Sequence, residues 1–302
     1  MHRCLFQASY PKPRQCDRIL FVNETLTAIM HHKTEFHLGP LPLTGFGIAM
    51  LGAFLIGQIV AQAELARRGH DEQVMADVVI AAVIGGLLGG KIYYAILMQD
   101  ASSLGQRAGF VFWGGLAGGI LATYAWIRYK KLSFAQISDV CAIGIAAAYA
   151  VGRSGCWAVG DDYGRAWASR FAVKFPEGAP PSTAANMVSE FKQIALASLP
   201  PTEVVAVYPT QLFEVAMGLV MFAILWRIRD HKHAAGWLFG AYCVLAGIER
   251  LVVEVFRAKD DRFFGPFTMA QVIAVLFIVG GAAWMQMRRN VRDGNAGIYA
   301  RA

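Results

Sequence analysis

The sequence predicts an all-α fold, a polytopic bundle of about seven transmembrane helices. Of the 302 residues, 56% are hydrophobic and 16% are charged, whereas soluble domains average roughly 45–50% and about 25%. Apolar runs repeatedly reach the ~20 residues that cross a bilayer as a helix. Because the backbone must satisfy its own hydrogen bonds in lipid, these runs are expected to be helical.

Seven such runs follow one another along the chain, four before a long polar stretch and three after it. The first follows a short lead-in, and the second and third contain paired glycines. The fourth ends in a glycine-punctuated polar turn, the fifth begins at Pro209, the sixth carries several charges, and the seventh closes the series. The predicted spans are residues 41–62, 75–97, 108–127, 137–159, 209–228, 236–255 and 267–287.

The paired glycines of the second and third spans lie at residues 85–90 and 114–119. Glycines four residues apart let helices approach closely in lipid, where the hydrophobic effect does not drive association. Close packing is the favoured interpretation. The alternative is that the glycines make room in the bundle for a lipid head group or an acyl chain.

The distribution of Lys and Arg between the short loops predicts the orientation. The loops that hold most of these residues lie inside if the amino terminus is outside and the carboxyl terminus is cytoplasmic. Residues 1–29 bring four basic residues to the outside and lack the apolar core of a signal peptide. They are therefore expected to be a disordered extension, or to precede a true start at Met30.

The expected organisation has one main domain. Residues 1–37 form an amino-terminal extension, 38–290 a transmembrane domain with an extracytoplasmic arm at 161–207, and 291–302 a cytoplasmic tail. The arm is rich in proline, with a short amphipathic helix expected over 184–197. It is interpreted as a lid or an acceptor-docking arm, and an inert surface insertion is the alternative.

Composition also excludes some classes of function. The net charge of +7 does not indicate nucleic-acid binding, because the basic residues lie in loops between spans and suit anionic lipid. The five cysteines include no CxxC pair and no metal-ligand spacing, so neither a disulfide framework nor a zinc site is predicted. No metal or other cofactor is expected.

The stretch GRSGCWAVGDDYGR at residues 152–165 is the strongest functional signal. Arg153 lies near the end of an apolar run, where a charge usually faces an interior cavity and a partner. A guanidinium suits phosphate because its planar fork of donors matches two oxygens. The stretch therefore predicts a site for an anionic ligand.

Further charges lie on or beside the last spans. Arg250 and Glu254 are one helical turn apart, as are Glu254 and Arg257, so each pair shares a helix face. One interpretation is a self-neutralising ion network. The other, which is favoured, is that the arginines exceed the acids facing them and leave positive charge for an anionic substrate. The remaining charges of this set are Glu214 and Glu249.

Taken together, these motifs resemble, in order, those of the bacterial prolipoprotein diacylglyceryl transferases. The resemblance extends from Leu38 to the last span. It is carried by LGP at 38–40, GGK at 89–91, GGLAG at 114–118, GRSGCWAVGDDYGR at 152–165, YPTQLFE at 208–214 and GIERLVVEVFR at 247–257.

The resemblance implies a multi-pass enzyme of the bacterial plasma (inner) membrane. Such an enzyme moves diacylglyceryl from phosphatidylglycerol to the thiol of the lipobox cysteine in a lipoprotein-precursor signal peptide, without a cofactor. Its partners would be that peptide, phosphatidylglycerol and the bilayer. Catalytic roles would fall on Arg153, Arg250, Asp161 and Glu254. Substrate-binding positions would be Arg153, Cys156, Gly160, Gly164, Arg165, Tyr208, Gln211, Glu214 and Arg257.

Three positions depart from the family pattern. The family's third-span histidine is Trp113 here, its signature asparagine is Cys156, and its first-span aromatic hydroxyl is Phe46. None of the seven histidines lies within a predicted span. Either a carboxylate of Asp161, Glu254 or Glu214 accepts the thiol proton, or the chain is a divergent paralogue. Such a paralogue would have another acceptor or would bind lipid without catalysis.

Cys156 and the number of spans leave two further alternatives. A thiol three residues after Arg153 would act as a nucleophile that takes lipid covalently if its pKa were depressed. The favoured interpretation is a small packing residue. A transporter is the less favoured class, because no internal repeat and no matched pair of broken helices is visible.

Overall fold

The computed structural model describes residues 28–38, 41–105, 109–258, 262–265 and 267–290. The predictions made for residues 1–27 and for the cytoplasmic tail at 291–302 lie outside the described residues. The chain forms two compact units. Of the described residues, the larger one comprises those within 35–157, 211–255 and 262–290, and the smaller one comprises 28–34, 158–210 and 256–258.

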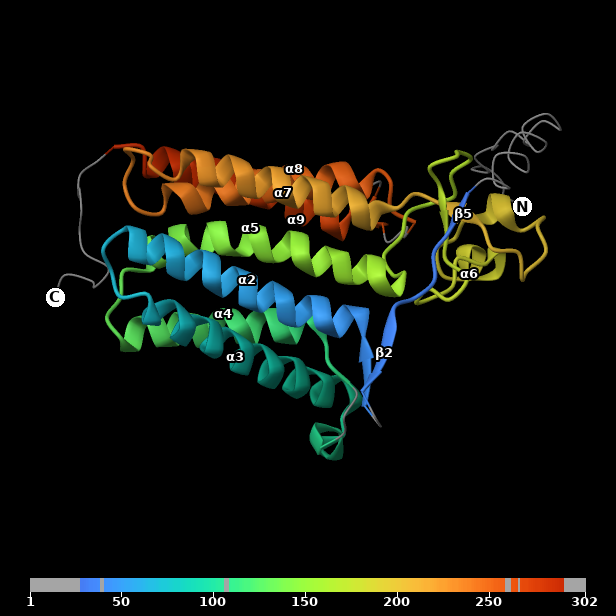
Figure 1. Ribbon diagram of the computed structural model, residues 1–302, viewed down its shortest axis with the longest axis horizontal. Helices are drawn as coiled ribbons and strands as arrows, with labels where there is room; N and C mark the ends of the chain where they lie inside the picture. Colours follow the sequence, from blue (N-terminus) through green and yellow to red (C-terminus); the bar gives the residue numbers. More distant parts are fainter. Residues whose placement is uncertain (1–27, 39–40, 106–108, 259–261, 266, 291–302) are drawn as a thin grey trace, which may run out of the picture. The chain divides into compact units, whose positions relative to one another are not determined.

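The larger unit is a bundle of long helices, and each predicted span corresponds to one of them (Figure 1). The all-α polytopic fold class is confirmed. The helices are α2 (Gly45–Arg67), α3 (Gln73–Met98), α4 (Phe112–Tyr129), α5 (Phe134–Val159), α7 (Thr210–Ile228), α8 (Trp237–Glu254) and α9 (Met269–Met287).

Five of these helices, α2, α3, α5, α7 and α9, are long and apolar enough to cross a membrane. The other two, α4 and α8, have 18 residues each. Glycines dilute the apolar residues of α4, and α8 carries Glu249, Arg250 and Glu254. Of the two helices that are least like simple lipid anchors, α4 thus contains one of the two sets of paired glycines, and α8 contains the charges.

Small residues determine which helices approach closely. A Cβ atom added at Gly118 on α4 would meet the backbone of Gly85 on α3, and one added at Gly144 on α5 would meet Gly57 on α2. The structure thus supports the packing interpretation of the paired glycines. The small residues of α5 make it the most buried of the five apolar helices, with 56% of its apolar window inside the structure.

Short strands flank the bundle helices in the chain. In the larger unit, β2 (Glu35–Leu38) and β3 (Leu41–Thr44) form an antiparallel hairpin, as do β6 (Arg262–Phe264) and β7 (Phe267–Thr268). The Thr44 side chain accepts a hydrogen bond from the backbone of Gly47 and so caps α2. Thr268 and Gln271 form a capping box that starts α9.

The smaller unit is built on a three-stranded sheet of β1 (Ile29–Met30), β4 (Val173–Lys174) and β5 (Ala206–Val207) in the order β1-β4-β5. β1 runs parallel to β4, and β5 runs antiparallel to it. The Ser182 hydroxyl, which is fully buried, accepts from the backbone of Phe175 and donates to Val205. Residues 29–30 of the expected amino-terminal extension thus belong to this sheet.

The amphipathic helix predicted over 184–197 is wrong in its extent. The structure has a short α6 (Ala184–Ser189) and a separate 3-10 turn, η2 (Ile194–Leu196). Thr183 caps the start of α6, but Lys192 adopts a φ of 57°, which a right-handed helix does not allow. A second 3-10 turn, η1 (Ala101–Gly105), follows α3 in the larger unit.

Candidate functional site

The larger unit brings together charged residues from α5, α7 and α8. Arg153 on α5 lies with its Nη2 atom 3.2 Å from Glu214 Oε1 on α7. Arg250 on α8 reaches the same oxygen with Nη1 at 4.0 Å, and its Nη2 atom lies 2.9 Å from Glu254 Oε2. Glu214 is fully buried. The two arginines of the predicted site therefore meet at one buried carboxylate, although 97 residues separate them in the chain.

Tyr149 and Glu249 belong to the same cluster. The sequence placed Glu249 among the charges of the last spans without a role of its own, and it did not single out Tyr149. The Tyr149 hydroxyl donates to Glu249 Oε1 at 2.9 Å, and its oxygen lies 3.4 Å from Glu214 Oε1. The Arg153 guanidinium lies over the Tyr149 ring, 5.4 Å from its centroid. The spacing contained a signal, since Tyr149 precedes Arg153 by one helical turn and so shares its face.

The charge of this cluster differs from the prediction. Two guanidiniums, Arg153 and Arg250, lie with three carboxylates, Glu214, Glu249 and Glu254. The third arginine that was counted toward a positive surplus, Arg257, belongs to the smaller unit. Carboxylates therefore already neutralise the two arginines in this structure.

Cys156 and Gln211 extend the cluster along α5 and α7. The Cys156 side chain is buried, and its sulfur accepts a hydrogen bond from Arg153 Nη1 at 3.6 Å. Gln211 is fully buried one turn before Glu214. Trp113, which the sequence resemblance aligns with a family histidine, is on α4 and is 54% exposed.

In the smaller unit, the second half of the signature is held by backbone hydrogen bonds. Gly164 N donates to the carbonyl of Tyr208 at 2.8 Å, and Arg165 N donates to that of Phe256 at 2.9 Å. A Cβ atom at Gly164 would collide with the Phe256 carbonyl and with the side chain of Tyr208. Gly160 has a φ of +68°, which favours glycine. Both glycines are thus required by the local backbone.

Tyr208 and Arg165 take part in this arrangement differently. The Tyr208 ring stacks on Trp167 with 4.3 Å between centroids and contacts Phe256 at 5.3 Å. Arg165 is exposed, and its carbonyl accepts from Tyr208 N. Tyr208 therefore forms part of the unit's aromatic packing, while the Arg165 side chain lies at the surface.

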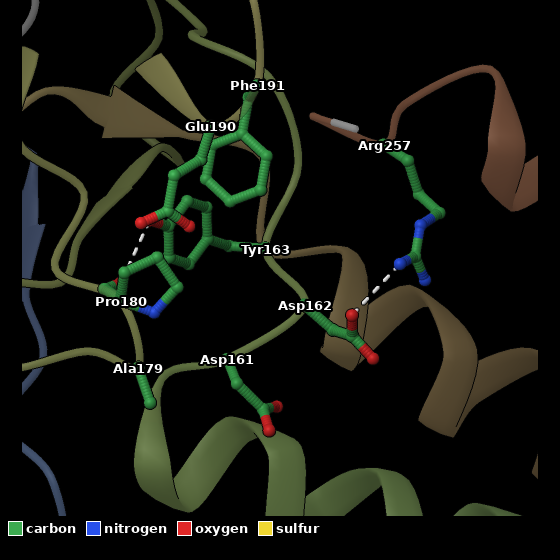
Figure 2. A pocket seen from close by; sticks show the side chains of 8 residues that line it. All are labelled: Asp161, Asp162, Tyr163, Ala179, Pro180, Glu190, Phe191 and Arg257. Atoms are coloured by element: carbon green, nitrogen blue, oxygen red, sulfur yellow. Dashed lines mark hydrogen bonds and ion pairs between the residues drawn. The ribbon is translucent and has the colours of Figure 1, made fainter. Parts of the chain in front are cut away.

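A pocket of about 340 Å³ lies within the smaller unit. Three acids line it, together with Arg257, whose Nη2 atom donates to Asp162 Oδ1 at 2.9 Å (Figure 2). The Tyr163 hydroxyl donates to the Pro180 carbonyl at 2.9 Å. Burial and the nearby Glu190 carboxylate raise the pKa of Tyr163, so this hydroxyl stays protonated. The lining residues are Asp161, Asp162, Tyr163, Ala179, Pro180, Glu190, Phe191 and Arg257.

The predicted site residues thus divide between the two units. Arg153, Cys156, Gln211, Glu214, Arg250 and Glu254 lie in the helical bundle, and Gly160, Asp161, Gly164, Arg165, Tyr208 and Arg257 lie in the smaller unit.

Comparison with known proteins supports one family. The model of the prolipoprotein diacylglyceryl transferase family matches residues 33–287. The phosphatidylglycerol–prolipoprotein diacylglyceryl transferase of Corynebacterium diphtheriae is 28% identical over 267 residues, which cover 84% of this chain and 92% of that protein. The enzymes of the same name from Clostridioides difficile and Geobacter sulfurreducens are each 28% identical. They cover 82% and 81% of this chain, and the matches span 92% and 91% of their own lengths.

Proposed function

The chain belongs to the prolipoprotein diacylglyceryl transferase family, and on this premise we propose that it transfers diacylglyceryl from phosphatidylglycerol to a cysteine thiol of a lipoprotein precursor. The thiolate sulfur forms a bond to the terminal glycerol carbon of the diacylglyceryl group. The bond from that carbon to the phosphate oxygen breaks, and glycerol phosphate leaves with the electron pair. The observation that carries this proposal is the convergence of Arg153 and Arg250 on Glu214 inside the bundle.

Arg153 and Arg250 bind the phosphate in this proposal. Each guanidinium presents a fork of donors to two phosphate oxygens. The interactions of both guanidiniums with the phosphate become more favourable as negative charge develops on the leaving group. Glu214 and Glu254 hold the forks in position before the lipid arrives, because they contact them at 3.2 Å and 2.9 Å. Gln211 and Cys156 support the same position from α7 and α5.

The protein is an integral protein of the bacterial inner membrane, in line with its family and its apolar helices. We further propose that its amino terminus is outside and its carboxyl terminus cytoplasmic, on the distribution of Lys and Arg. The smaller unit would then lie outside, where precursors arrive after translocation.

We propose that the smaller unit receives the precursor polypeptide. Its pocket combines three carboxylates with one guanidinium and presents the aromatic rings of Tyr163 and Phe191. This combination suits a basic side chain of the precursor, because a cation gains from both carboxylates and aromatic faces. Asp161 belongs to this pocket, so its proposed role is in holding the acceptor.

Reversing one charge of the pocket should weaken the binding of the acceptor peptide and leave the binding of phosphatidylglycerol unchanged. In Glu190→Lys, we expect the KM for a lipobox peptide with a lysine beside its cysteine to rise about tenfold. This rise corresponds to a loss of about 1.4 kcal/mol in the free energy of peptide binding. The KM for phosphatidylglycerol should not change. Glu177→Lys makes the same charge change at a site in this unit that is 48% exposed and outside the pocket. Equal effects of the two substitutions on the peptide would contradict acceptor binding in the pocket.

The transfer reaction itself is tested with purified protein in phosphatidylglycerol vesicles. Lipobox peptide is added, and peptide lipidation and glycerol phosphate release are measured together. The proposal expects both products in equal amounts from the wild-type protein. Lipidation that appears only in Trp113→His would indicate that this chain has lost the reaction, and release without lipidation would indicate another acceptor.

A further inference from the structure

Tyr149 on α5 and Glu249 on α8 form a contact that the roles described so far do not use. The Tyr149 hydroxyl donates to Glu249 at 2.9 Å and also reaches Glu214, which contacts Arg153. Glu249 is 8% exposed, whereas Tyr149 is only partly buried. The pair therefore joins a buried carboxylate to a hydroxyl that lies directly beside the predicted phosphate site.

Transfer to a thiol requires a proton acceptor, because the thiolate and not the thiol is the nucleophile. A cysteine thiol has a pKa of about 8.5, so only about 1% is ionised at pH 6.5. None of the chain's seven histidines lies within the seven long helices of the bundle. The acceptor in the bundle must therefore come from another type of side chain.

Resting on the proposed transferase activity, we propose that Tyr149 and Glu249 are the proton relay that generates the thiolate. The thiol S–H bond breaks, and its proton passes to the Tyr149 oxygen. In the same step the proton of Tyr149 moves along the 2.9 Å hydrogen bond to Glu249 Oε1. Tyr149 ends unchanged, Glu249 ends neutral, and the thiolate attacks the glycerol carbon.

The charge balance of the cluster favours this direction of proton transfer. Three carboxylates lie with two guanidiniums, and phosphatidylglycerol adds one more negative charge. A proton on Glu249 leaves two carboxylates with the two guanidiniums and the phosphate, and the negative charge that Glu249 gives up appears on the thiol sulfur. The total charge of the site is unchanged, but the relay moves negative charge from the crowded carboxylates to the atom that attacks the glycerol carbon.

The relay is tested by the pH dependence of kcat/KM for a lipobox peptide in phosphatidylglycerol vesicles. We expect Glu249→Gln and Tyr149→Phe each to lose about 10²-fold at pH 6.5. The loss should shrink to a few-fold near pH 8.5, where about half of the thiol ionises without help. The double variant should lose no more than either single variant, since both act on one proton.

The surrounding charges are the same in the wild type and in both variants. Glu214 and Arg153 face Tyr149, Arg250 lies against Glu214, and Tyr242 on α8 interacts electrostatically with Glu249. Both variants leave these side chains in place. The readout is the change in the loss relative to the wild type between pH 6.5 and pH 8.5, so a reduced amount of folded protein that is the same at both pH values does not alter it.

Matched controls are Tyr124→Phe on α4 and Glu72→Gln before α3, both at exposed positions. They should retain the wild-type curve. Losses in Glu249→Gln and Tyr149→Phe that are equal at every pH, or no loss at all, would overturn the relay while the transferase proposal stands. A wild-type protein that lipidates no peptide overturns both.

Discussion

Arg153→Ala should reduce kcat/KM for diacylglyceryl transfer by about 10³-fold, the largest loss expected of any single substitution. The variant loses a guanidinium that is proposed to bind the phosphate both before and during bond cleavage. It also removes the nearer of the two guanidiniums that contact Glu214, since Arg250 lies at 4.0 Å. Transfer to a lipobox peptide in phosphatidylglycerol vesicles measures the effect, and complementation of a strain depleted of its own transferase measures it in cells.

A second substitution at this position separates charge from geometry, and a substitution elsewhere serves as a control. Arg153→Lys keeps the charge but loses the planar fork, so it should recover only part of the lost activity. Arg170→Ala removes an exposed arginine of the smaller unit and should behave as the wild type. Arg153→Ala activity within a few-fold of the wild type would refute phosphate binding by this residue.

Glu214→Gln should cost the bundle about 3–5 kcal/mol of stability, the second large effect. Glu214 is fully buried and contacts both Arg153 and Arg250, so neutralising it leaves two guanidiniums with less compensation. The measurement is thermal unfolding in vesicles. Glu72→Gln, at the exposed start of α3, removes a charge without this burial and should unfold as the wild type.

The lipid composition makes this second experiment specific to the proposed site. If a phosphate can take the place of the missing carboxylate charge, phosphatidylglycerol should restore more of the lost stability than phosphatidylcholine does. A deficit that is the same in both lipids would indicate that Glu214 has only a structural role. An unchanged melting temperature would contradict the claim that the ion pairs of Glu214 stabilise the bundle.

The helices and the order of the motifs could be predicted from the sequence, because both are local properties. Seven apolar runs of sufficient length became seven helices with boundaries within a few residues of those predicted. The helix expected over 184–197 failed for an equally local reason, since Lys192 adopts a left-handed backbone conformation. Amphipathic spacing alone does not detect such a break.

The charge of the site could not be predicted in the same way. Counting arginines and acids along the sequence suggested a positive surplus, yet Arg257 pairs with Asp162 in the smaller unit and Glu249 joins Tyr149 in the bundle. Residues 149 and 249 are 100 positions apart. Only the rotation and register of α5 against α8 bring these two side chains into hydrogen-bonding distance.

The sequence by itself determined that the chain is a polytopic helical membrane protein of a known transferase family. Hydropathy and segment length decide the membrane bundle, because a backbone in lipid must satisfy its own hydrogen bonds. The family is indicated by the ordered set of motifs. Tertiary structure decided which carboxylates neutralise Arg153 and Arg250, and that Tyr149 connects them to Glu249. The physical reason is that such contacts depend on how helices pack, and small residues on several helices set that packing together.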